Sequence, residues 1–415
     1  MPRLLLLAHR IPFPPDKGEK LRAYNFITHL ADRFDIRLGC LVDNPADWDG
    51  VAALRRLCGE VGAFPLDRRR QRLTALLRAR PGRSLMLDYY RSVPLRRWTE
   101  GQFAQGVDAA LVYTAAMMPY VLGARLPTLL DMVDVDSEKW AMYARRARGP
   151  MRAVWAREAR TLLGFERRAA LVSAVTLLVS RQEAARFAEL APEAREKIDW
   201  VENGVDLDAF SPSRVWPNPF PDAGPHLVFI GHMDYWPNVD AVQWFAAEVM
   251  PCLRARHPAP RFWIVGANPS EAVKRLAALP GVHVTGRVPE VQPYLAHASA
   301  CVSPLRMARG IQNKVLEAMA MGRPVVASPQ AFEGVRAEAG THLLVADGAE
   351  ETARAVAAIL DGHHSRLGEA ARRAMEEGYA WKATLRRLDA HLARCLDQRF
   401  PQREECRPPT DSVWP

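Results

Sequence analysis

Short apolar runs alternate with helical patterns along nearly the whole chain, and this alternation restricts the fold more than any other feature. In the first half the runs lie at Leu4–Ala8, Ile36–Val42, Ala109–Tyr113, Thr128–Val133 and Val175–Val179. In the second half they lie at His226–Gly231, Arg261–Gly266, Val282–Thr285, Ala300–Pro304, Pro324–Ser328 and Leu343–Val345. Such short runs, separated by helices, are typical of buried parallel strands. The sequence therefore predicts an α/β fold with two doubly wound sheets.

Two domains are expected, because 415 residues are enough to build two separate cores. The boundary is predicted at residues 206–225, which contain Pro212, Pro217, Pro219, Pro221 and Pro225. Pro-rich polar segments usually connect domains. We therefore expect domains at 1–205 and 226–378, followed by a C-terminal helix at 379–398. Residues 399–415 have no periodicity and are expected to be disordered.

The segment from Arg309 to Ser328 carries the clearest chemical signal. It reads as a polar glycine loop, a short helix, a Gly-Arg-Pro turn and a buried strand. Gly310 lets the backbone approach a ligand closely, and the helix opens near Asn313, so that free N–H groups face the loop. This arrangement suits a diphosphate. Lys314 and Glu317 lie on one side of the helix, which places a cation for phosphate beside a carboxylate for sugar hydroxyls.

Composition excludes several classes of protein. The net charge of +9 allows binding to anionic lipids, phosphorylated substrates or nucleic acid, but the sequence contains no nucleic-acid recognition motif, and we expect no such partner. The six cysteines include no Cys-x-x-Cys pair, which indicates reduced thiols and a cytoplasmic location. We expect neither a signal peptide nor a transmembrane segment, because no apolar run is long enough.

Four segments resemble glycosyltransferase family 4, the retaining enzymes of the GT-B fold. K-V-L-E-A-M-A-M-G-R-P-V-V, beginning at Lys314, resembles the donor-site helix of that family. The other three are Leu4–Arg22, Val201–Pro212 and Phe229–Ala241, in the same order as in the family. D-V-D-S-E-K-W, from Asp134 to Trp140, together with the Tyr-Trp-Pro-Asn turn at 235–238, resembles a branch associated with PEP-CTERM and exosortase exopolysaccharide systems.

The resemblance implies a GT-B architecture, in which two Rossmann-like domains face a central cleft. The first domain would bind the acceptor, the second the donor, and the C-terminal helix would return to the first domain. The implied activity is retaining transfer from a nucleotide diphosphate sugar to a glycan or lipid-linked saccharide in bacterial exopolysaccharide synthesis. The donor is a substrate, and neither a cofactor nor an obligatory metal is expected.

Three side chains of the second half would hold the donor. The resemblance assigns Glu317 to the ribose hydroxyls, with an ordinary exposed carboxylate as the alternative. Lys314 and Arg306 are candidates for the diphosphate, which arginine can bind with two parallel hydrogen bonds. Many family members carry an arginine and a lysine on the turn after the first donor-domain strand. Here that turn, residues 231–238, has neither, so the cations must come from elsewhere.

Arg309 departs from the family pattern. The family usually has two glutamates eight positions apart, and the first would fall on Arg309, which cannot accept hydrogen bonds as a carboxylate does. Two explanations are open: either Arg309 binds phosphate or a sugar carboxylate, or the register of this loop differs from that of the family. The amides of Gly310 and Ile311 remain candidate sugar or phosphate donors. His232 is either a phosphate ligand or a packed loop residue.

Glycines at strand ends complete the expected donor site. Gly286 lies in the segment that resembles the family's base-reading backbone. Gly18 lies in the loop after the first strand, which the family places against the donor diphosphate and the acceptor. Lys17, Glu19, Lys20 and Arg22 surround Gly18, and individually they read as solvated charges.

Asp134 and Asp136 form an Asp-x-Asp motif after a strand of the first domain. In the other large transferase fold such a motif binds a divalent metal. Here we expect an acceptor-side role, removal of the proton from the acceptor hydroxyl, with helix capping near Ser137 as the alternative for one of them.

A basic segment of the first domain suggests a membrane surface as a further partner. Arginines at 68, 69, 70, 72, 78, 80 and 83 crowd around Leu73, Leu76 and Leu77. This pattern predicts an amphipathic helix on the inner face of a membrane, although a solvated helix fits equally well.

Three other functions remain open. A nucleotide-sugar epimerase of the same fold would work without an acceptor. A dinucleotide oxidoreductase fits poorly, because no Gly-x-Gly-x-x-Gly follows an early strand. A non-catalytic nucleotide-sugar binding protein would explain the departure at Arg309.

Overall fold

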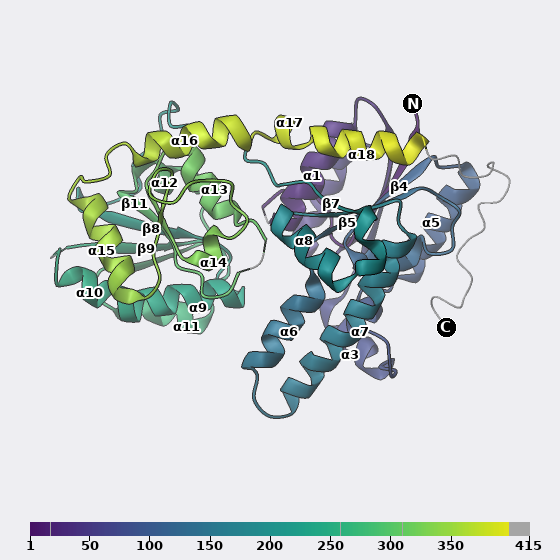
Figure 1. The fold of residues 1–415 in the computed structure, drawn as a ribbon, viewed down its shortest axis with the longest axis horizontal. Helices are drawn as coiled ribbons and strands as arrows, with labels where there is room; N and C mark the ends of the chain where they lie inside the picture. The colour runs from purple at the N-terminus through teal and green to yellow at the C-terminus, as the bar shows by residue number, and fades with distance from the viewer. Residues whose placement is uncertain (17, 258, 309, 398–415) are drawn as a thin grey trace. The chain divides into compact units, whose positions relative to one another are not determined.

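A computed structural model describes residues 1–397 except 17, 258 and 309. The described residues form two compact units: Met1–Glu202 together with the described residues from Leu385 onward, and Asn203–Thr384 (Figure 1). Each unit is built on its own parallel sheet. Arg309 and the segment 399–415 lie outside the described residues.

The first sheet has the strand order β3-β2-β1-β4-β5-β6-β7, with all pairs parallel. Its strands are β1 (Arg3–Ala8), β2 (Asp35–Val42), β3 (Glu60–Pro65), β4 (Ala109–Tyr113), β5 (Thr128–Val133), β6 (Val175–Leu178) and β7 (Ile198–Trp200). The five predicted strands are present. Strands β3 and β7 were not predicted, because these edge strands are only partly buried and do not form apolar runs.

Helices connect the strands of the first sheet, and one further helix of this unit comes from the end of the described chain. They are α1 (Gly18–Leu30), α2 (Gly50–Leu54), α3 (Arg68–Leu77), α4 (Leu85–Tyr89), α5 (Val93–Gln105), α6 (Asp136–Arg146), α7 (Pro150–Val172), α8 (Arg181–Leu190) and α18 (Arg386–Asp397). Short 3₁₀ turns lie at Pro45–Asp49, Ala115–Tyr120 and Pro192–Lys197. Helices α6 and α7 form a long hairpin that extends from the sheet (Figure 1).

The core of the first unit contains a buried ion pair. Leu4–Leu7 are fully buried on β1, and Arg22 of α1 and Asp131 of β5 are fully buried beside them. Arg22 donates from Nε and Nη2 to the two carboxylate oxygens of Asp131, at 2.7 and 3.0 Å. A charge pair this deep is tolerated because both groups are paired with good geometry. Arg22 is therefore a structural residue, and not the solvated charge that its sequence suggested.

The second sheet has the order β10-β9-β8-β11-β12-β13, again parallel. Its strands are β8 (His226–Ile230), β9 (Arg261–Val265), β10 (Val282–Gly286), β11 (Ala300–Ser303), β12 (Val325–Ala327) and β13 (Leu344–Val345). Each corresponds to one predicted run. Its α-helices are α9 (Trp236–Trp244), α10 (Met250–Arg254), α11 (Glu271–Lys274), α12 (Gln292–His297), α13 (Asn313–Ala320), α14 (Pro329–Phe332), α15 (Ala349–Leu360), α16 (Leu367–Gly378) and α17 (Trp381–Thr384). A π-helical turn lies at Phe245–Val249 and a 3₁₀ turn at Arg275–Ala278.

The Pro-rich segment 206–225, which we expected to be a linker, is packed within the second unit. Trp216 and Phe220 are each only 7% exposed. The carbonyl of Trp216 lies 2.8 Å from His297 Nε2, and the ring of Phe220 stacks on His226 with centroids 3.9 Å apart. These contacts of Trp216 and Phe220 anchor the segment to the second unit.

The segment 379–398, expected as one helix, is divided where the chain passes from one unit to the other. Helix α17 belongs to the second unit, where Ala380 pairs with Val205 in an isolated bridge. Helix α18 belongs to the first unit. There the Asp389 carboxylate lies 2.8 Å from His29 Nε2, and Arg387 donates to Asp199 at 2.7 Å.

Both sheets contain a point where the strand order reverses. In the first sheet it lies between β1 and β4, and in the second between β8 and β11. In open α/β sheets, ligands bind outside the carboxyl ends of the strands at such a point. The residues that follow these four strands are therefore the first places to look for a functional site.

Candidate functional site

The ammonium group of Lys314 lies at the reversal point of the second sheet. Lys314 belongs to the first turn of α13, and its Nζ atom donates to Asn238 Oδ1 at 2.6 Å. Asn238 belongs to the first turn of α9, which follows β8. The same ammonium lies 4.4 Å from the ring centroid of Phe229 in β8. The N-terminal ends of two helices therefore meet at one cation, and an anion is favoured there.

The turn before α9 explains how Asn238 comes to face Lys314. Pro237 pre-sets the first helical turn, and Asn238 Nδ2 donates to the carbonyl of His232 at 2.9 Å. Its amide oxygen is then left to accept from the lysine. Gly231 is required at the start of this turn, since a Cβ atom there would lie 2.7 Å from Asn238 Nδ2.

Lys314 and Glu317 perturb each other's ionisation. Burial lowers the pKa of Lys314 to about 7, although the Glu317 carboxylate opposes this shift. Burial raises the pKa of Glu317 to about 7, although the Lys314 ammonium opposes this shift. Each group therefore gains or loses its charge near neutral pH. Pairs of groups perturbed by burial and by each other are common at functional sites.

Arg306 is held away from this pair. Its side chain forms a two-pronged ion pair with Asp240 of α9, with Nε 2.9 Å from Oδ2 and a second contact from Nη2 to Oδ1. Asn238 and Asp240 thus lie two positions apart on one helix and bind different cations. The structure brings Lys314, Glu317 and Asn238 together, and it does not add Arg306 to them.

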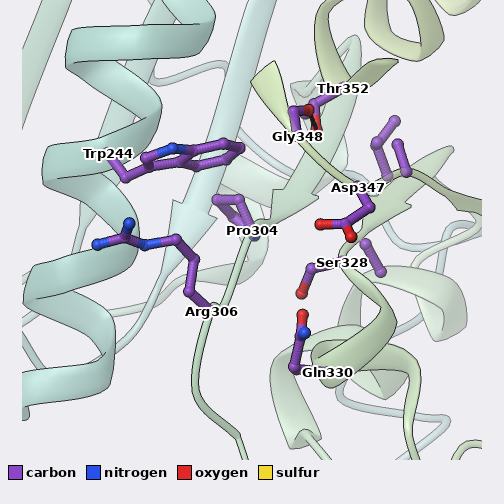
Figure 2. A pocket seen from close by; sticks show the side chains of 11 residues that line it. Trp244, Pro304, Arg306, Ser328, Gln330, Asp347, Gly348 and Thr352 are labelled. Carbon is purple, nitrogen blue, oxygen red and sulfur yellow. Dashed lines mark hydrogen bonds between the residues drawn. The ribbon is translucent and has the colours of Figure 1, made fainter. Parts of the chain in front are cut away.

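Arg306 instead borders a cavity of about 260 Å³ (Figure 2). Trp244 and Arg306 lie on one side of it, and Ser328, Gln330 and Asp347 lie on the other. Neither Lys314 nor Glu317 lines it. The Ser328 hydroxyl bonds to Leu305 O at 2.6 Å and caps α14, so it serves the backbone. The cavity lies beside the reversal point and does not contain the perturbed pair.

The remaining donor-site predictions fall on loops around α13 and the strand ends. Gly310 has a φ of 63° and its carbonyl accepts from Gln312 Nε2 at 3.2 Å, while Ile311 is buried. Gly286 ends β10 with a φ of 71°, a conformation that favours glycine. His232 lies on the turn that Asn238 closes. Its imidazole is not brought against Lys314 by any described contact.

Sequence reasoning missed Asn238 and Phe229, the two partners of Lys314. Both lie in the segment that carried the resemblance, but an asparagine in a turn and a phenylalanine in a strand have ordinary structural explanations. The signal that could have found Asn238 was its place after proline in the first turn of a helix that follows a parallel strand.

In the first unit, the charges around Gly18 are structural. Gly18 begins α1. Lys20 is buried and its Nζ lies 2.6 Å from Asp47 Oδ2. Glu19 pairs with Arg10. Lys17 lies outside the described residues. The predicted role of Gly18 against a diphosphate therefore rests on its place in the chain alone.

The two aspartates after β5 lie in different environments. Asp134 Oδ1 has no hydrogen-bond partner among the described residues, and burial raises its pKa to about 7. Asp136 begins α6 and pairs with Lys139 at 3.0 Å. Glu166, which accepts from the backbone N–H of Ser137, takes the capping position that we had considered for an aspartate. In the described part of the chain, no group of three His, Cys, Asp or Glu side chains is placed to hold a metal.

The basic segment forms α3, whose apolar side chains are uncovered. Leu73, Leu76 and Leu77 are 64, 61 and 86% exposed. Asp67 caps the helix by accepting from the N–H groups of Arg69 and Arg70. None of the described helices has the length and apolarity needed to cross a bilayer.

One family model matches part of the second unit. Residues 224–362 match the family described as glycosyl transferases group 1. No protein with a curated description matches the chain by sequence.

Three solved structures share the fold of the whole chain at low sequence identity. HepE of Anabaena, in complex with UDP-glucose, is 14% identical with a TM-score of 0.67, over 94% of this chain and 99% of that one. Sucrose-phosphate synthase from Thermosynechococcus elongatus is 16% identical with a TM-score of 0.71, over 95% and 98%. WaaG, a glycosyltransferase involved in lipopolysaccharide biosynthesis, is 16% identical with a TM-score of 0.64, over 93% and 99%. The predicted GT-B fold is confirmed.

Proposed function

We propose that the protein transfers a sugar from a nucleotide diphosphate sugar to a glycan or lipid-linked saccharide, with retention of configuration, as a family 4 glycosyltransferase. The observation that carries this proposal is the pair of Lys314 and Glu317 at the reversal point of the group 1 glycosyltransferase domain. Transfer of this kind leaves a diphosphate, and fixed positive charge at the leaving oxygen stabilises the transition state most.

Each donor residue has a distinct role in this proposal. Lys314 and the N-terminal ends of α9 and α13 bind the diphosphate, and Glu317 accepts from the ribose hydroxyls. The amides of Gly310 and Ile311 face the sugar or its phosphate. Arg306 joins the diphosphate by exchanging Asp240 for phosphate oxygens, because its Nε and Nη2 atoms now pair with that carboxylate. The acceptor oxygen bonds the anomeric carbon as the bond to phosphate breaks.

Asp134 is the proposed proton acceptor for the hydroxyl of the acceptor. A carboxylate with an unpartnered oxygen and a pKa near 7 matches a general base that works at neutral pH. Asp136, paired with Lys139, has a supporting electrostatic role at most.

Uracil is the first base to test, because HepE was solved with UDP, with UDP-glucose and with UDP and glucose. The test is release of free UDP from a panel of UDP-sugars, with saccharide acceptors present and absent. Acceptor-dependent release that Glu317→Ala abolishes supports transfer. Release of a free or epimerised sugar without any acceptor would instead support the nucleotide-sugar epimerase. Binding with no product in either case would support a non-catalytic binding protein.

A lipid-linked acceptor and a role in exopolysaccharide synthesis rest on the resemblance of Asp134–Trp140, and on the description of WaaG as a lipopolysaccharide enzyme. They imply a cytoplasmic protein on the inner face of the membrane. Helix α3 supports this location, because its exposed leucines are spaced at i, i+3 and i+4 among arginines.

The tip of the α6–α7 hairpin extends the same basic and apolar character. Arg145, Arg146, Arg148 and Arg152 are exposed there beside Met151, which is 44% exposed. The segment after α3 is bonded to α7, since Arg157 Nη2 donates to the carbonyl of Arg83 at 2.9 Å. Positive charge around exposed apolar side chains fits an anionic lipid surface.

Sedimentation with vesicles tests the location. We expect binding to phosphatidylglycerol vesicles, loss of most of it in the triple variant Leu73→Ser, Leu76→Ser and Leu77→Ser, and no binding to phosphatidylcholine vesicles. Equal binding by the variant and the parent protein would show that the leucines of α3 do not contact the membrane.

A further inference from the structure

Polar side chains gather at the reversal point of the first sheet as well. His9 follows β1, Tyr113 ends β4 and Thr114 follows it. The rings of His9 and Tyr113 stack, with centroids 5.8 Å apart and planes at 10°, and Tyr90 packs edge-on against His9 at 5.3 Å. The next strand, β5, leads to Asp134, whose field acts on Tyr113. The sequence analysis assigned a role to Asp134 alone.

Four polar atoms in this group have no hydrogen-bond partner among the described residues. They are His9 Nδ1, Tyr113 Oη, Thr114 Oγ1 and Asp134 Oδ1. The first three side chains are 7, 1 and 8% exposed. Leaving a buried polar atom unpaired costs about 1–3 kcal/mol, and such atoms are rare in native proteins. Four of them at the ends of three adjacent strands indicate a missing partner.

A neighbouring tyrosine shows that the fold pairs buried hydroxyls elsewhere. Tyr120 is as buried as Tyr113, yet its hydroxyl accepts from the N–H of Ser92 at 2.7 Å and donates to the carbonyl of Tyr90 at 2.7 Å. Tyr113 has no such pair of partners among the described residues.

The backbone at the same place is strained. Thr114 has a φ of 74° and Val133 a φ of 67°, although both are β-branched. Of the described residues other than glycine, only Asn268 shares this left-handed conformation, which asparagine tolerates. Strain of this kind costs about 1–3 kcal/mol for each residue and is found mostly at ligand sites.

We propose that His9, Tyr113 and Thr114 form, with Asp134, a binding site for the hydroxyl groups of a saccharide acceptor. The inference rests on the proposed glycosyl transfer and adds the residues that recognise its second substrate. The hydroxyl groups of Tyr113 and Thr114 both donate and accept, and Asp134 accepts from a sugar hydroxyl. His9 holds the sugar through Nδ1 while its ring is fixed between two tyrosines.

The neutral imidazole of His9 suits the hydroxyl groups of a sugar. Three carboxylates, those of Glu19, Asp43 and Asp136, act on His9 together with one cation, Arg10. Burial lowers the pKa of His9, so the imidazole is neutral and can donate from one nitrogen and accept at the other. A sugar hydroxyl both donates and accepts, so it can pair with Nδ1 of His9 in either tautomer of the neutral ring.

The test uses the full chain with histidine labelled in its imidazole nitrogens. The His9 resonances are identified by their absence in His9→Gln, and they are followed during titration with the methyl glycosides of glucose, galactose, mannose and N-acetylglucosamine. We expect at least one glycoside to shift them in a saturable manner. Thr114→Val and Tyr113→Phe should each lower the affinity for that glycoside about tenfold, because each removes one hydrogen bond.

Two controls separate the possible results. Tyr120→Phe removes a buried hydroxyl outside the site and should leave the glycoside affinity unchanged. Lys314→Ala, which disables the proposed donor site, should leave it unchanged too. The inference is overturned if no glycoside shifts His9, if inorganic phosphate shifts it instead, or if Tyr113→Phe binds like the parent protein. Stabilisation by UDP in that case would still support the donor site.

Discussion

Lys314 Nζ lies 2.6 Å from Asn238 Oδ1, and this contact joins the first turns of α13 and α9 across 76 positions of the chain. The lysine is half-buried, its ammonium lies against the ring of Phe229, and the field of Glu317 acts on it. Asn238 offers a dipole in place of a full negative charge. Lys314 therefore holds its proton weakly and can bind an anion. A carboxylate at position 238 would instead compensate the positive charge of the ammonium.

Asn238→Asp tests this relationship. A carboxylate at 238 should favour the charged form of Lys314 and raise its pKa from about 7 toward the ordinary lysine value. It should also repel a diphosphate, so that UDP binds more weakly although the lysine is now charged. Calorimetric titration with UDP from pH 6 to 9 measures both effects. Tighter binding of UDP at neutral pH would show that Asn238 does not position Lys314 for an anion.

Diphosphate binding should depend on pH through Lys314. The ammonium form is present below its pKa of about 7, so binding should weaken as pH rises through that value. Lys314→Arg is the matched control, because a guanidinium stays charged throughout. Titration of the ligand itself is common to both proteins. Between pH 7 and 8, the affinity of the parent protein for pyrophosphate should fall by up to about tenfold relative to the variant. Parallel pH profiles would contradict the assignment of Lys314.

Tyr113→Phe should stabilise the protein. The substitution removes a buried hydroxyl that has no partner among the described residues, and with it a penalty of roughly 1 kcal/mol. Tyr120→Phe should do the opposite, because it leaves the N–H of Ser92 and the carbonyl of Tyr90 without their partner. Denaturant unfolding of both variants measures the difference. Equal destabilisation would mean that Tyr113 is satisfied by bound water, and would weaken the proposed sugar site.

Val133→Gly should also increase the free energy of unfolding, by about 1 kcal/mol. Glycine adopts a φ of 67° without strain, and the relief exceeds the extra entropy of the unfolded chain. Val135→Gly serves as the control, since Val135 has an ordinary φ of −82° and is buried. It should be strongly destabilising. A stable Val133→Gly protein with weakened glycoside binding would connect the strain to the sugar site.

The sequence predicted the sheets well and the edges poorly. Central strands such as Leu4–Ala8 are buried on both faces and read as apolar runs, whereas Glu60–Pro65 and Ile198–Trp200 lie at sheet edges and do not. The prolines of residues 206–225 indicated a linker, and they carried no signal for its packing. Trp216 and Phe220 anchor it to the second unit, Trp216 through its contact with His297, 81 positions away.

The site was predictable where the chemistry follows a local motif. Lys314 and Glu317 share one helix, so their spacing alone placed them together. Asn238 was missed because only the fold brings it to Lys314. His9 and Tyr113 were missed for the same reason: His9 follows β1 and Tyr113 ends the neighbouring strand β4, and the missing hydrogen-bond partners of a side chain cannot be read from a sequence. Arg22 looked exposed because its partner, Asp131, lies 109 positions away in the sequence.

Thermal unfolding with UDP, with Glu317→Ala as the variant, tests the central claim most directly. UDP at about a hundred times its Kd adds roughly 2.7 kcal/mol to the stability of the parent protein, a readable shift in Tm. Glu271→Ala, which removes an exposed carboxylate paired with Lys274 in the same unit, is the control. We predict a rise in Tm with UDP in the parent and the control, and none in Glu317→Ala. An equal rise in all three proteins would contradict the donor site, and no rise in any would contradict UDP as its ligand.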